Sequence, residues 1–378
     1  MRVCFLEDTM LHGGTQIWVT EAALKFMEMG VDVTILSPES GFVAKTLAES
    51  GARIVTYGYD AVVDQSDAQK AIWRGAFEDS DVVVCTVHPP RGDGFHCSVF
   101  AGAVIKEAGL NTVLIPKTGT IVPDYLREYY CPVEGIRNRV IAITNFTLEY
   151  LVSDYQIPES VADLVYQGTE VARFTPDPAR KADARERYPV PEGAGPILGN
   201  VGSFEERKGQ GVLLDAVAAC RDRLPGIHLI LVGDGPDEAM LKERVESMGL
   251  QDCVTFFPFT REPVYVFEAI DILVLSSLYK EGLPNVLLEA MSMHLPVVSS
   301  RMAGVPEVVF DGETGYMVEP GDFQQLADGI VRCWTDQDQY ARMAANARKL
   351  MEDKFDKKVQ FGAFVEYFDR VLADYESA

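Results

Sequence analysis

Residues 275–298 read LSSLYKEGLPNVLLEAMSMHLPVV and place two glutamates, Glu281 and Glu289, around a glycine–proline loop that follows an apolar run. We predict a strand over Ile272–Ser276 and a helix that begins near Pro284, because proline suits the first helical position and has no N–H to leave unpaired. The free N–H groups of such a helix start attract phosphate. The stretch therefore predicts a parallel α/β sheet with an anion site at the end of one strand.

The residue types in this loop favour a sugar nucleotide. Gly282 lets a ligand approach the backbone closely, while Glu281 lies at the mouth of the loop and Glu289 about one turn inside the helix. Two carboxylates would repel phosphate, so we expect them to accept hydrogen bonds from sugar or ribose hydroxyls while the N–H groups of Leu283–Asn285 hold the anion. An ordinary strand–loop–helix unit with a solvated glutamate explains this stretch, taken alone, equally well.

The same stretch resembles the signature of the retaining glycosyltransferases of family 4, in which two glutamates separated by seven residues lie in a segment like EGLPNVLLEAM. Four further blocks follow in the family's order: VYQGTEVARFTP (165–176), NVGSFEERKG (200–209), LVGDGP (231–236) and SRMAGVPEVVFDGETGYMVEPGD (300–322). The resemblance implies the α/β fold called GT-B, in which two Rossmann-like doubly wound parallel-sheet domains face each other across a cleft. It also implies transfer of a sugar with retention of configuration.

The composition is that of a large enzyme. A chain of 378 residues exceeds what one core usually serves, and a net charge of −23 argues against binding nucleic acid or an anionic membrane surface. The sequence contains no apolar run of membrane-spanning length, and MRVCFLED carries charge too early for a secretory signal, so we expect a cytoplasmic protein. Seven scattered cysteines without C-x-x-C spacing are expected to be reduced thiols. Composition does not indicate the oligomeric state.

Short apolar strands alternate with segments of helical periodicity, and this pattern occurs twice. In the first half we predict strands at residues 2–6, 32–36, 53–57, 82–87, 112–116 and 140–144. In the second half we predict strands at residues 196–201, 228–232, 254–257, 272–276, 296–299 and 315–318. Each of these strands is short and nearly all apolar, as buried parallel strands are.

The segment TPDPARKADARERYPVPEGAGP, which follows Phe174, is rich in proline and charge and has the composition of a linker. We therefore divide the chain into an acceptor-side domain (1–175), a linker (176–195), a nucleotide-sugar-binding domain (196–355) and a C-terminal helix (356–378). The last helix has aromatic residues at helical spacing that would bury one face. The resemblance to GT-B enzymes implies that this helix returns to the N-terminal domain.

The resemblance assigns a phosphate-binding cation to the C-terminal domain. Lys208, just past a strand in EERKG, would hold the diphosphate, since a fixed ammonium stabilises the negative charge that develops on the leaving group. The family usually has an arginine five residues earlier, where this chain has Ser203. Arg207 is a possible substitute, although a solvent-facing position is the simpler interpretation of a charged residue on a loop.

The nucleotide itself is expected beside two other strand ends. Gly233 and Gly235 lie in a loop that resembles the family's nucleotide-side loop, where glycines permit close backbone approach. The base is expected near Phe259, after the next strand. The residues do not specify which base is bound, because backbone groups often recognise it in this fold.

In the N-terminal half, Gly13 and Gly14 follow the first strand and open the first helix. They resemble the family's glycine-rich loop beside the donor phosphates and the acceptor, and a plain turn between strand and helix is the alternative. Family members commonly have a histidine at the end of the fifth strand, where we place Lys117. A charged lysine can donate a hydrogen bond to a sugar hydroxyl but cannot accept one. His88, at the end of the preceding strand, is the alternative contact.

We expect a metal-independent transferase that moves a hexosyl group from a nucleotide-diphosphate sugar, with UDP as the expected nucleotide, to an acceptor hydroxyl. Glu281 would orient the sugar, Glu289 would hold the ribose diol, and Lys208 would replace a metal ion at the diphosphate. No cofactor is expected, and the acceptor would be sugar-containing or lipid-linked. Two alternatives remain: a sugar-nucleotide epimerase on the same fold, and a non-catalytic partner of an active glycosyltransferase, which the departures at Ser203 and Lys117 motivate.

Overall fold

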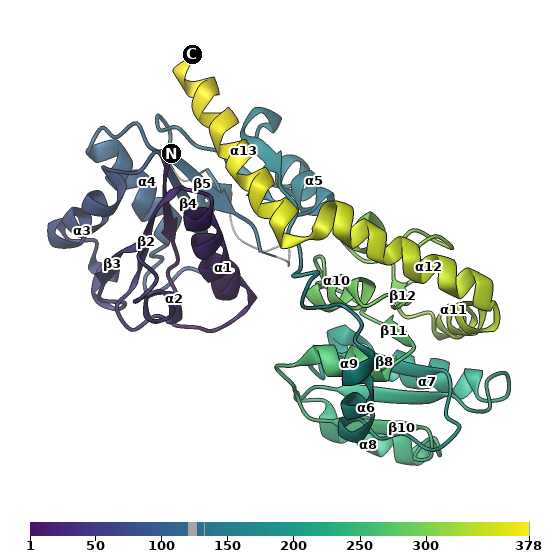
Figure 1. Cartoon of the computed structure of the whole chain (residues 1–378). Coiled ribbons are helices and arrows are strands. Elements are labelled where there is room, and N and C mark those ends of the chain that lie inside the picture. Colours follow the sequence, from purple (N-terminus) through teal and green to yellow (C-terminus); the bar gives the residue numbers. More distant parts are fainter. Residues whose placement is uncertain (120–126, 132, 378) are drawn as a thin grey trace. The chain divides into compact units, whose positions relative to one another are not determined.

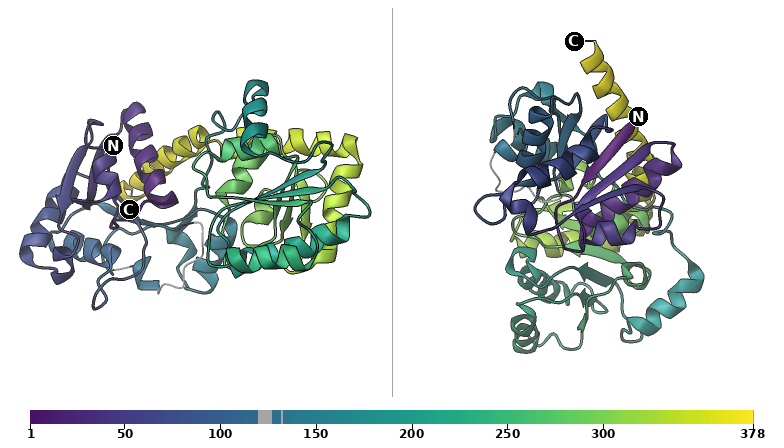
Figure 2. Two further views of the ribbon diagram at one scale, coloured as in Figure 1. Left: turned by 90° about the horizontal axis from the view of Figure 1, so that it is seen from below. Right: turned by 90° about the vertical axis from the view of Figure 1, so that its left-hand side faces the viewer.

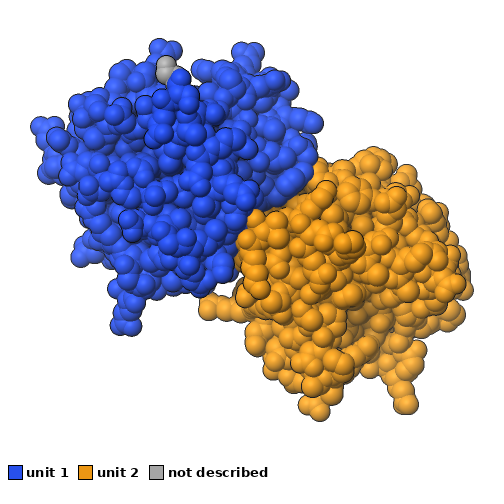
Figure 3. Space-filling view, turned by 45° about the horizontal axis from the view of Figure 1, so that its top comes forward, with its two compact units in different colours: residues 1–166, 360–378 blue, residues 167–359 orange. Residues whose placement is uncertain are grey.

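The structure is a computed structural model that describes residues 1–119, 127–131 and 133–377. The chain divides into two compact units: unit 1 comprises residues 1–166 and 360–378, and unit 2 comprises residues 167–359 (Figure 3). Within each unit a parallel sheet is covered by helices on both of its faces (Figure 2). Each unit is therefore a doubly wound α/β domain.

In the described residues of unit 1 the sheet has seven strands in the order β3-β2-β1-β4-β5-β6-β7. The strands are β1 (Arg2–Leu6), β2 (Asp32–Pro38), β3 (Arg53–Tyr57), β4 (Val82–Thr86), β5 (Val113–Lys117), β6 (Val140–Ala142) and β7 (Ala162–Leu164). The helices are α1 (Gly14–Glu28), α2 (Phe42–Thr46), α3 (Asp67–Phe77), α4 (Cys97–Glu107), α5 (Asn145–Ser153) and α13 (Lys357–Glu376), with short 3-10 turns at Ala61–Asp64, Arg127–Tyr129 and Glu159–Val161.

Unit 2 contains a six-stranded sheet, among the residues described, in the order β10-β9-β8-β11-β12-β13. The strands are β8 (Ile197–Val201), β9 (His228–Val232), β10 (Val254–Phe257), β11 (Ile272–Leu275), β12 (Val297–Ser300) and β13 (Gly315–Val318). The helices are α6 (Pro178–Arg187), α7 (Gln210–Cys220), α8 (Glu238–Ser247), α9 (Pro263–Ala269), α10 (Asn285–Ser292), α11 (Phe323–Thr335) and α12 (Gln337–Leu350), with 3-10 turns η4 (Glu206–Lys208) and η5 (Val305–Glu307) and a π-helical turn at Met351–Phe355.

The central strands of unit 1 are mostly apolar because both faces of the sheet are covered there. On β1, Val3 and Phe5 belong to the core beneath α1 and α13, whereas Cys4 and Leu6 belong to the core beneath α3 and α4. Successive residues of a strand point to opposite faces, so a strand that is buried on both sides has no polar alternation. This property made the strands recognisable in the sequence.

The last helix of the chain completes the core of unit 1 (Figure 1). Phe361, Phe364 and Phe368 of α13 are buried and lie on one face of the helix, because their spacing of three and four residues matches the helical turn. The ring centroids of Trp18 and Phe364 are 5.2 Å apart, and those of Phe26 and Phe361 are 6.1 Å apart. The first and last helices of the chain therefore share one aromatic core.

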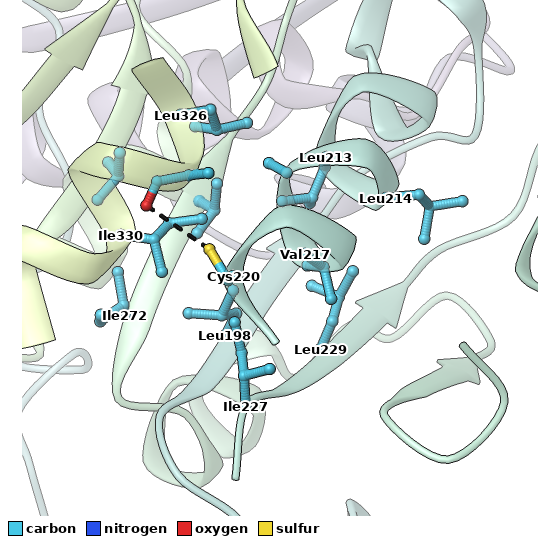
Figure 4. Packing of buried hydrophobic residues seen from close by; sticks show 14 of the residues in the cluster. Leu198, Leu213, Leu214, Val217, Cys220, Ile227, Leu229, Ile272, Leu326 and Ile330 are labelled. Atoms are coloured by element: carbon cyan, nitrogen blue, oxygen red, sulfur yellow. Dashed lines mark hydrogen bonds between the residues drawn. The ribbon is translucent and has the colours of Figure 1, made fainter. Parts of the chain in front are cut away.

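The core of unit 2 lies between its sheet and the helices α7, α8 and α11 (Figure 4). Figure 4 shows Cys220 at the end of α7 with its Sγ directed at the carbonyl oxygen of Ala327 on α11, and these atoms are 3.6 Å apart. Leu198 of β8 and Ile272 of β11 are fully buried beside them. These two strands lie side by side at the centre of the sheet, and their carboxyl ends carry the site described below.

The segment predicted as a linker, 176–195, contains helix α6. Asp177 caps the helix by accepting a hydrogen bond from the Ala179 N–H at 2.9 Å, and Pro178 occupies the first position. Arg180 of α6 forms an ion pair of 3.0 Å with Glu268 of α9, so the segment is part of unit 2. The chain passes from unit 1 to unit 2 between Tyr166 and Gln167, earlier than the predicted end of the first domain at residue 175.

Strand β7 was not predicted. It is only three residues long and pairs in parallel with β6, and Asp163 and Leu164 are only partly buried, so it lacks the apolar run that marked the other strands. The predicted strand 140–144 ends at Ala142, because Thr144 accepts a hydrogen bond from the Thr147 N–H at 3.0 Å and caps α5 instead.

Both sheets reverse their strand order at a point that fixes where a ligand can bind. The reversal lies between β1 and β4 in unit 1 and between β8 and β11 in unit 2. Loops that leave neighbouring strands toward opposite faces open a crevice beyond the carboxyl ends of those strands. Glu7 and His88 follow β1 and β4, and Lys208 and Glu281 follow β8 and β11. The topology therefore gathers ionisable side chains at one edge of each sheet.

Gly209 brings the loop after β8 against the end of β11. Its φ is +64°, and a Cβ atom at this position would lie 2.0 Å from the carbonyl oxygen of Ser276. No other residue fits this close approach of two backbones.

We predict that Gly209→Ala lowers the free energy of unfolding by more than about 1 kcal/mol, because the new Cβ clashes with backbone at a left-handed φ. Gly211→Ala is the matched control, since nothing lies within 4 Å of a Cβ there and the residue is in helix α7. The control should stabilise the protein by roughly 0.5–1 kcal/mol. Chemical denaturation measures both values, and equal stability of the two variants would contradict the close approach.

Candidate functional site

Unit 2 gathers charged side chains where β8 and β11 end. Lys208, at the end of η4, donates a hydrogen bond from Nζ to Oε1 of Glu281, which lies on the loop after β11. Ser277 Oγ donates to the same oxygen at 2.8 Å, and Arg207 Nη1 lies 3.5 Å from it. Glu281 is only 7% exposed, so two cations and a hydroxyl replace the water that would otherwise solvate its charge. We call Ser203, Glu205, Arg207, Lys208, Ser277 and Glu281 the Glu281 cluster.

Arg207 is part of this cluster, and the interpretation that it faces solvent is wrong. Its side chain is 21% exposed and lies between two carboxylates, with Nε 2.9 Å from Oε2 of Glu205. Ser203 Oγ donates to Oε1 of the same glutamate. The hydrogen bond from Arg207, followed by that from Ser203, lowers the pKa of Glu205 below its usual value. Both loop cations are therefore paired with carboxylates within the cluster.

Gly233 and Gly235 are required by contact between two loops. A Cβ atom at Gly233 would lie 1.9 Å from the carbonyl oxygen of Gly202, and one at Gly235 would lie 2.3 Å from that of Phe204. The loop after β9 thus rests directly on the loop after β8. These glycines support the backbone that carries Lys208, in addition to any approach that they allow a ligand.

Helix α10 begins at Asn285, and Pro284 is its N-cap residue rather than its first helical residue. Proline has no N–H, so Leu283 and Asn285 supply the amide donors of this tripeptide. The carbonyl oxygen of Gly282 accepts a hydrogen bond from the Gly304 N–H at 3.1 Å, which ties the loop to the segment after β12. Asn285 Oδ1 accepts a hydrogen bond from Gln167 Nε2 at 3.1 Å.

Glu289 lies one turn inside α10 and is partly buried. Burial raises the pKa of Glu289 to about 7, although the charges of Arg173 and Lys357 act in the opposite direction. A carboxyl group with this pKa changes its charge near neutral pH: its ionised form only accepts hydrogen bonds, whereas its protonated form also donates one. Phe259, which follows β10, is 62% exposed and offers an aromatic face at the same edge of the sheet.

In unit 1 the sequence analysis missed a buried carboxylate. Glu7 follows β1 directly and is fully buried. Its Oε1 accepts hydrogen bonds from Gln16 Nε2 at 2.9 Å, His88 Nε2 at 2.7 Å and Thr9 Oγ1 at 3.1 Å, and its Oε2 accepts one from Thr86 Oγ1. We call these five residues the Glu7 cluster. A charged residue immediately after the apolar strand RVCFL was a signal for this site.

Lys117 ends β5 inside unit 1, where it is 3% exposed. Its Nζ lies 4.1 Å from the centroid of the Trp18 ring and donates a hydrogen bond to the carbonyl oxygen of Thr118 at 3.3 Å. Burial lowers the pKa of Lys117 to about 7, and the charge of Glu7 only partly offsets this effect. The ammonium group predicted to contact a sugar is thus held against an aromatic ring.

The predicted site residues divide between the two units. Unit 2 brings Lys208 and Glu281 into direct contact and places Gly282, Leu283 and Pro284 on the same loop. In unit 1, Gly13 is the N-cap residue of α1 and Gly14 is its first residue. These glycines lie at the carboxyl edge of the unit 1 sheet, which also carries the Glu7 cluster.

Three further findings concern metals, thiols and membranes. In the part of the chain that the structure describes, no three His, Cys, Asp or Glu side chains gather in a way that suits a metal ion. All seven cysteines are free thiols. No helix in the described ranges is both long enough and apolar enough to cross a bilayer.

Sequence comparison places the chain among known transferases. The family described as Glycosyl transferases group 1 matches residues 183–350. The chain is 32% identical over 261 residues to the lipopolysaccharide core biosynthesis glycosyltransferase LpsE of Rhizobium meliloti. This alignment covers 66% of this chain and 73% of LpsE. The chain is 29% identical over 218 residues to a GDP-mannose-dependent alpha-(1-6)-phosphatidylinositol monomannoside mannosyltransferase of Mycobacterium tuberculosis. That alignment covers only 56% of either protein.

Solved structures show the same fold over the whole chain. The crystal structure of Anabaena Alr3699/HepE in complex with UDP has a TM-score of 0.83 at 19% identity and covers 98% of this chain and 100% of HepE. A glycosyltransferase from Rickettsia africae has a TM-score of 0.82 and covers 98% of each chain. The fold and the site thus define a two-domain glycosyltransferase of the GT-B class. The chain belongs to the Glycosyl transferases group 1 family, whose members use nucleotide-sugar donors.

The buried Lys117 leads to a prediction about stability and pH. The pKa of Lys117 in the folded protein lies below that of a free lysine, so folding disfavours the protonated form. The resulting loss in the free energy of unfolding is fully present below about pH 7, shrinks as the pH rises, and is absent above about pH 10.5. Lys117→Met should therefore raise the free energy of unfolding by roughly 1–3 kcal/mol near pH 6, and the gain should shrink near pH 9.

Denaturation at both pH values measures this difference, and Lys242→Met on the surface of α8 is the control. The Lys242 side chain is 52% exposed, so its replacement should change stability little at either pH. A gain for Lys117→Met that is the same at both pH values would show that the lysine is not buried as an ionisable group.

Proposed function

We propose that this protein transfers a hexosyl group from a nucleotide-diphosphate sugar, preferably a UDP-sugar, to an acceptor hydroxyl with retention of configuration and without a metal ion. The observation that carries this proposal is the Glu281 cluster. It combines a buried carboxylate with two cations at the point where the strand order of unit 2 reverses, which is where doubly wound sheets bind nucleotides.

The chemistry requires charge of both signs. As the glycosidic bond breaks, the departing diphosphate gains negative charge and the sugar gains oxocarbenium character. Lys208 and Arg207 supply positive charge to the diphosphate, together with the N–H groups of Leu283 and Asn285 at the start of α10. Glu281 accepts hydrogen bonds from sugar hydroxyls and orients the ring beside the leaving group.

Retention requires the acceptor hydroxyl to attack from the face that the diphosphate leaves. In this proposal the departing phosphate itself takes the proton of the acceptor hydroxyl. Because Glu281 is already hydrogen-bonded by Lys208 and Ser277, it is better suited to orient the ring than to attack the anomeric carbon.

The nucleotide and acceptor are assigned from weaker support. We place the ribose diol on Glu289 and the base beside Phe259. HepE has been crystallised with UDP, whereas the mannosyltransferase relative is GDP-mannose-dependent, and we prefer UDP because HepE matches over the full chain. The acceptor is sugar-containing or lipid-linked, in keeping with the lipopolysaccharide core and the phosphatidylinositol monomannoside that appear in the names of two relatives. Gly13, Gly14 and Lys117 would belong to the acceptor side.

Membership of a glycosyltransferase family favours transfer over the two alternatives. Without an acceptor, an epimerase on this fold would yield a donor whose changed sugar is still attached, or a freed nucleotide together with an unsaturated sugar. A non-catalytic partner would have no need of the paired charges of the Glu281 cluster.

We predict that Glu281→Gln and Lys208→Ala each lower turnover by roughly 100- to 1,000-fold, because each removes a charge that acts in the transition state. The donor is first identified by thermal shift against UDP, GDP, ADP and their common sugar conjugates, since a ligand of the native state raises its melting temperature. Turnover is then measured as release of the nucleoside diphosphate.

Lys242→Ala, which removes an exposed lysine from the same unit, is the control and should keep full activity. Stability must be measured in parallel, because removing Lys208 leaves Arg207 as the cation nearest to Glu281. Near-normal turnover of both site variants would refute the assigned roles.

A second prediction concerns Arg207, whose charge is shared with Glu205. Glu205→Gln should release Arg207 toward the diphosphate and lower the Kd for UDP roughly two- to fivefold. Glu206→Gln is the matched control, because it changes the net charge equally on the adjacent residue, whose carboxylate accepts a hydrogen bond from Tyr279 at 3.2 Å. Calorimetric titration measures both constants. If both variants bind UDP more tightly to the same extent, the change in net charge explains the effect and Arg207 does not contact the diphosphate specifically.

A further inference from the structure

The Glu7 cluster in unit 1 has no role in the donor chemistry proposed above, yet it surrounds one fully buried carboxylate with four hydrogen-bond partners. Thr9, Gln16 and Thr86 supply three neutral donors to the Glu7 carboxylate and tie together the loop after β1, the first turn of α1 and the end of β4. These bonds explain the local fold. They do not explain why a histidine is the fourth partner.

The hydrogen bond to Glu7 fixes the orientation of the His88 ring. A carboxylate only accepts hydrogen bonds, so the ring nitrogen 2.7 Å from Oε1 of Glu7 must carry its proton, and that nitrogen is Nε2. The other nitrogen, Nδ1, therefore points away from the cluster. The described residues supply no hydrogen-bond partner for Nδ1, and the His88 side chain is 19% exposed.

The charges around His88 favour its protonated form. Glu7 on β1 is the nearest carboxylate, and Asp8 is next, but Asp8 is already held by Arg91 at 2.7 Å and 2.9 Å. Lys117 on β5 and His96 at the start of α4 are the positively charged or titratable groups on the neighbouring elements. Burial opposes protonation of His88, but the hydrogen bond and charge of Glu7 outweigh it, so the pKa of His88 is raised.

We propose that Glu7 is a positioning residue for glycosyl transfer: it holds the His88 imidazolium with Nε2–H toward β1, so that Nδ1–H donates a hydrogen bond to a substrate hydroxyl. This inference rests on the proposed function, because it needs a hydroxyl-bearing substrate at the carboxyl edge of the unit 1 sheet. His88 touches the substrate, and Glu7 acts only through His88. The lysine at the end of β5 is then not the residue that meets the sugar from this unit.

The proposal predicts a specific pH dependence. His88 donates from Nδ1 only while it is protonated, so kcat should fall as the pH rises through the raised pKa of His88. Glu7→Gln keeps an oxygen that accepts from Nε2–H but removes the negative charge. This variant should shift the alkaline limb of kcat to lower pH by roughly one to three units. His88→Gln should lower kcat roughly 10- to 100-fold and abolish that limb.

The test follows release of nucleoside diphosphate from the donor that the thermal-shift screen identifies, over a range of pH, for the parent protein and both variants. His228→Gln is the control, because this buried histidine at the start of β9 donates to or accepts from Thr255 at 2.9 Å and lies at the opposite edge of its sheet. Its pH profile should match that of the parent. An alkaline limb that does not move in Glu7→Gln would overturn the proposal.

Nitrogen-15 NMR of the histidine side chains gives a second readout that needs no activity. The chain has five histidines, so the His88 signals are identified by their loss in His88→Gln. In the parent protein the neutral form of His88 should carry its proton on Nε2 and titrate above a free histidine, and in Glu7→Gln it should titrate lower. If the neutral form of His88 in the parent protein carries its proton on Nδ1 instead of Nε2, that result by itself overturns the proposal, even if Glu7→Gln does not fold. The proposed function fails differently, through unchanged turnover of Lys208→Ala and Glu281→Gln.

Discussion

A buried carboxylate at the end of β11 organises the functional edge of unit 2. Glu281 is almost excluded from water, so its charge must be matched by donors from the protein itself. Lys208 can reach it only because Gly209 lets the loop after β8 touch the backbone of Ser276. Gly233 and Gly235 hold that loop from the other side. A backbone constraint at three glycines thus places one ammonium group beside one carboxylate.

The two units satisfy a buried carboxylate in different ways. In unit 2 the partners of Glu281 are full cations, and a phosphate that enters the site can compete for them. In unit 1 the partners of Glu7 are three neutral groups and one imidazole, so the network is fixed and only the protonation of His88 can change. The first arrangement suits binding of an anion, and the second suits precise orientation of one side chain.

The sequence predicted twelve of the strands in their correct places because each is a short, mainly apolar run, and most of them are buried on both faces. It also predicted the site loops of unit 2, because glycine and proline mark strand ends. Strand β7 and helix α6 were missed, since a three-residue edge strand has no pattern and a charged amphipathic helix resembles a linker in composition. The partners of Glu281 and Glu7 could not be predicted, because they come from loops that only the folded sheet brings together.

The central claim is that the nucleotide sugar binds beyond the carboxyl ends of β8 and β11. Hydrogen–deuterium exchange of the whole chain with and without saturating UDP, and separately GDP, tests it most directly. The account predicts that exchange slows at residues 203–209 and 281–287 and stays unchanged at the amino-terminal ends of the strands in both units. The account would be contradicted if a nucleotide binds to the protein but exchange slows only in other segments and is unchanged in both of these loops.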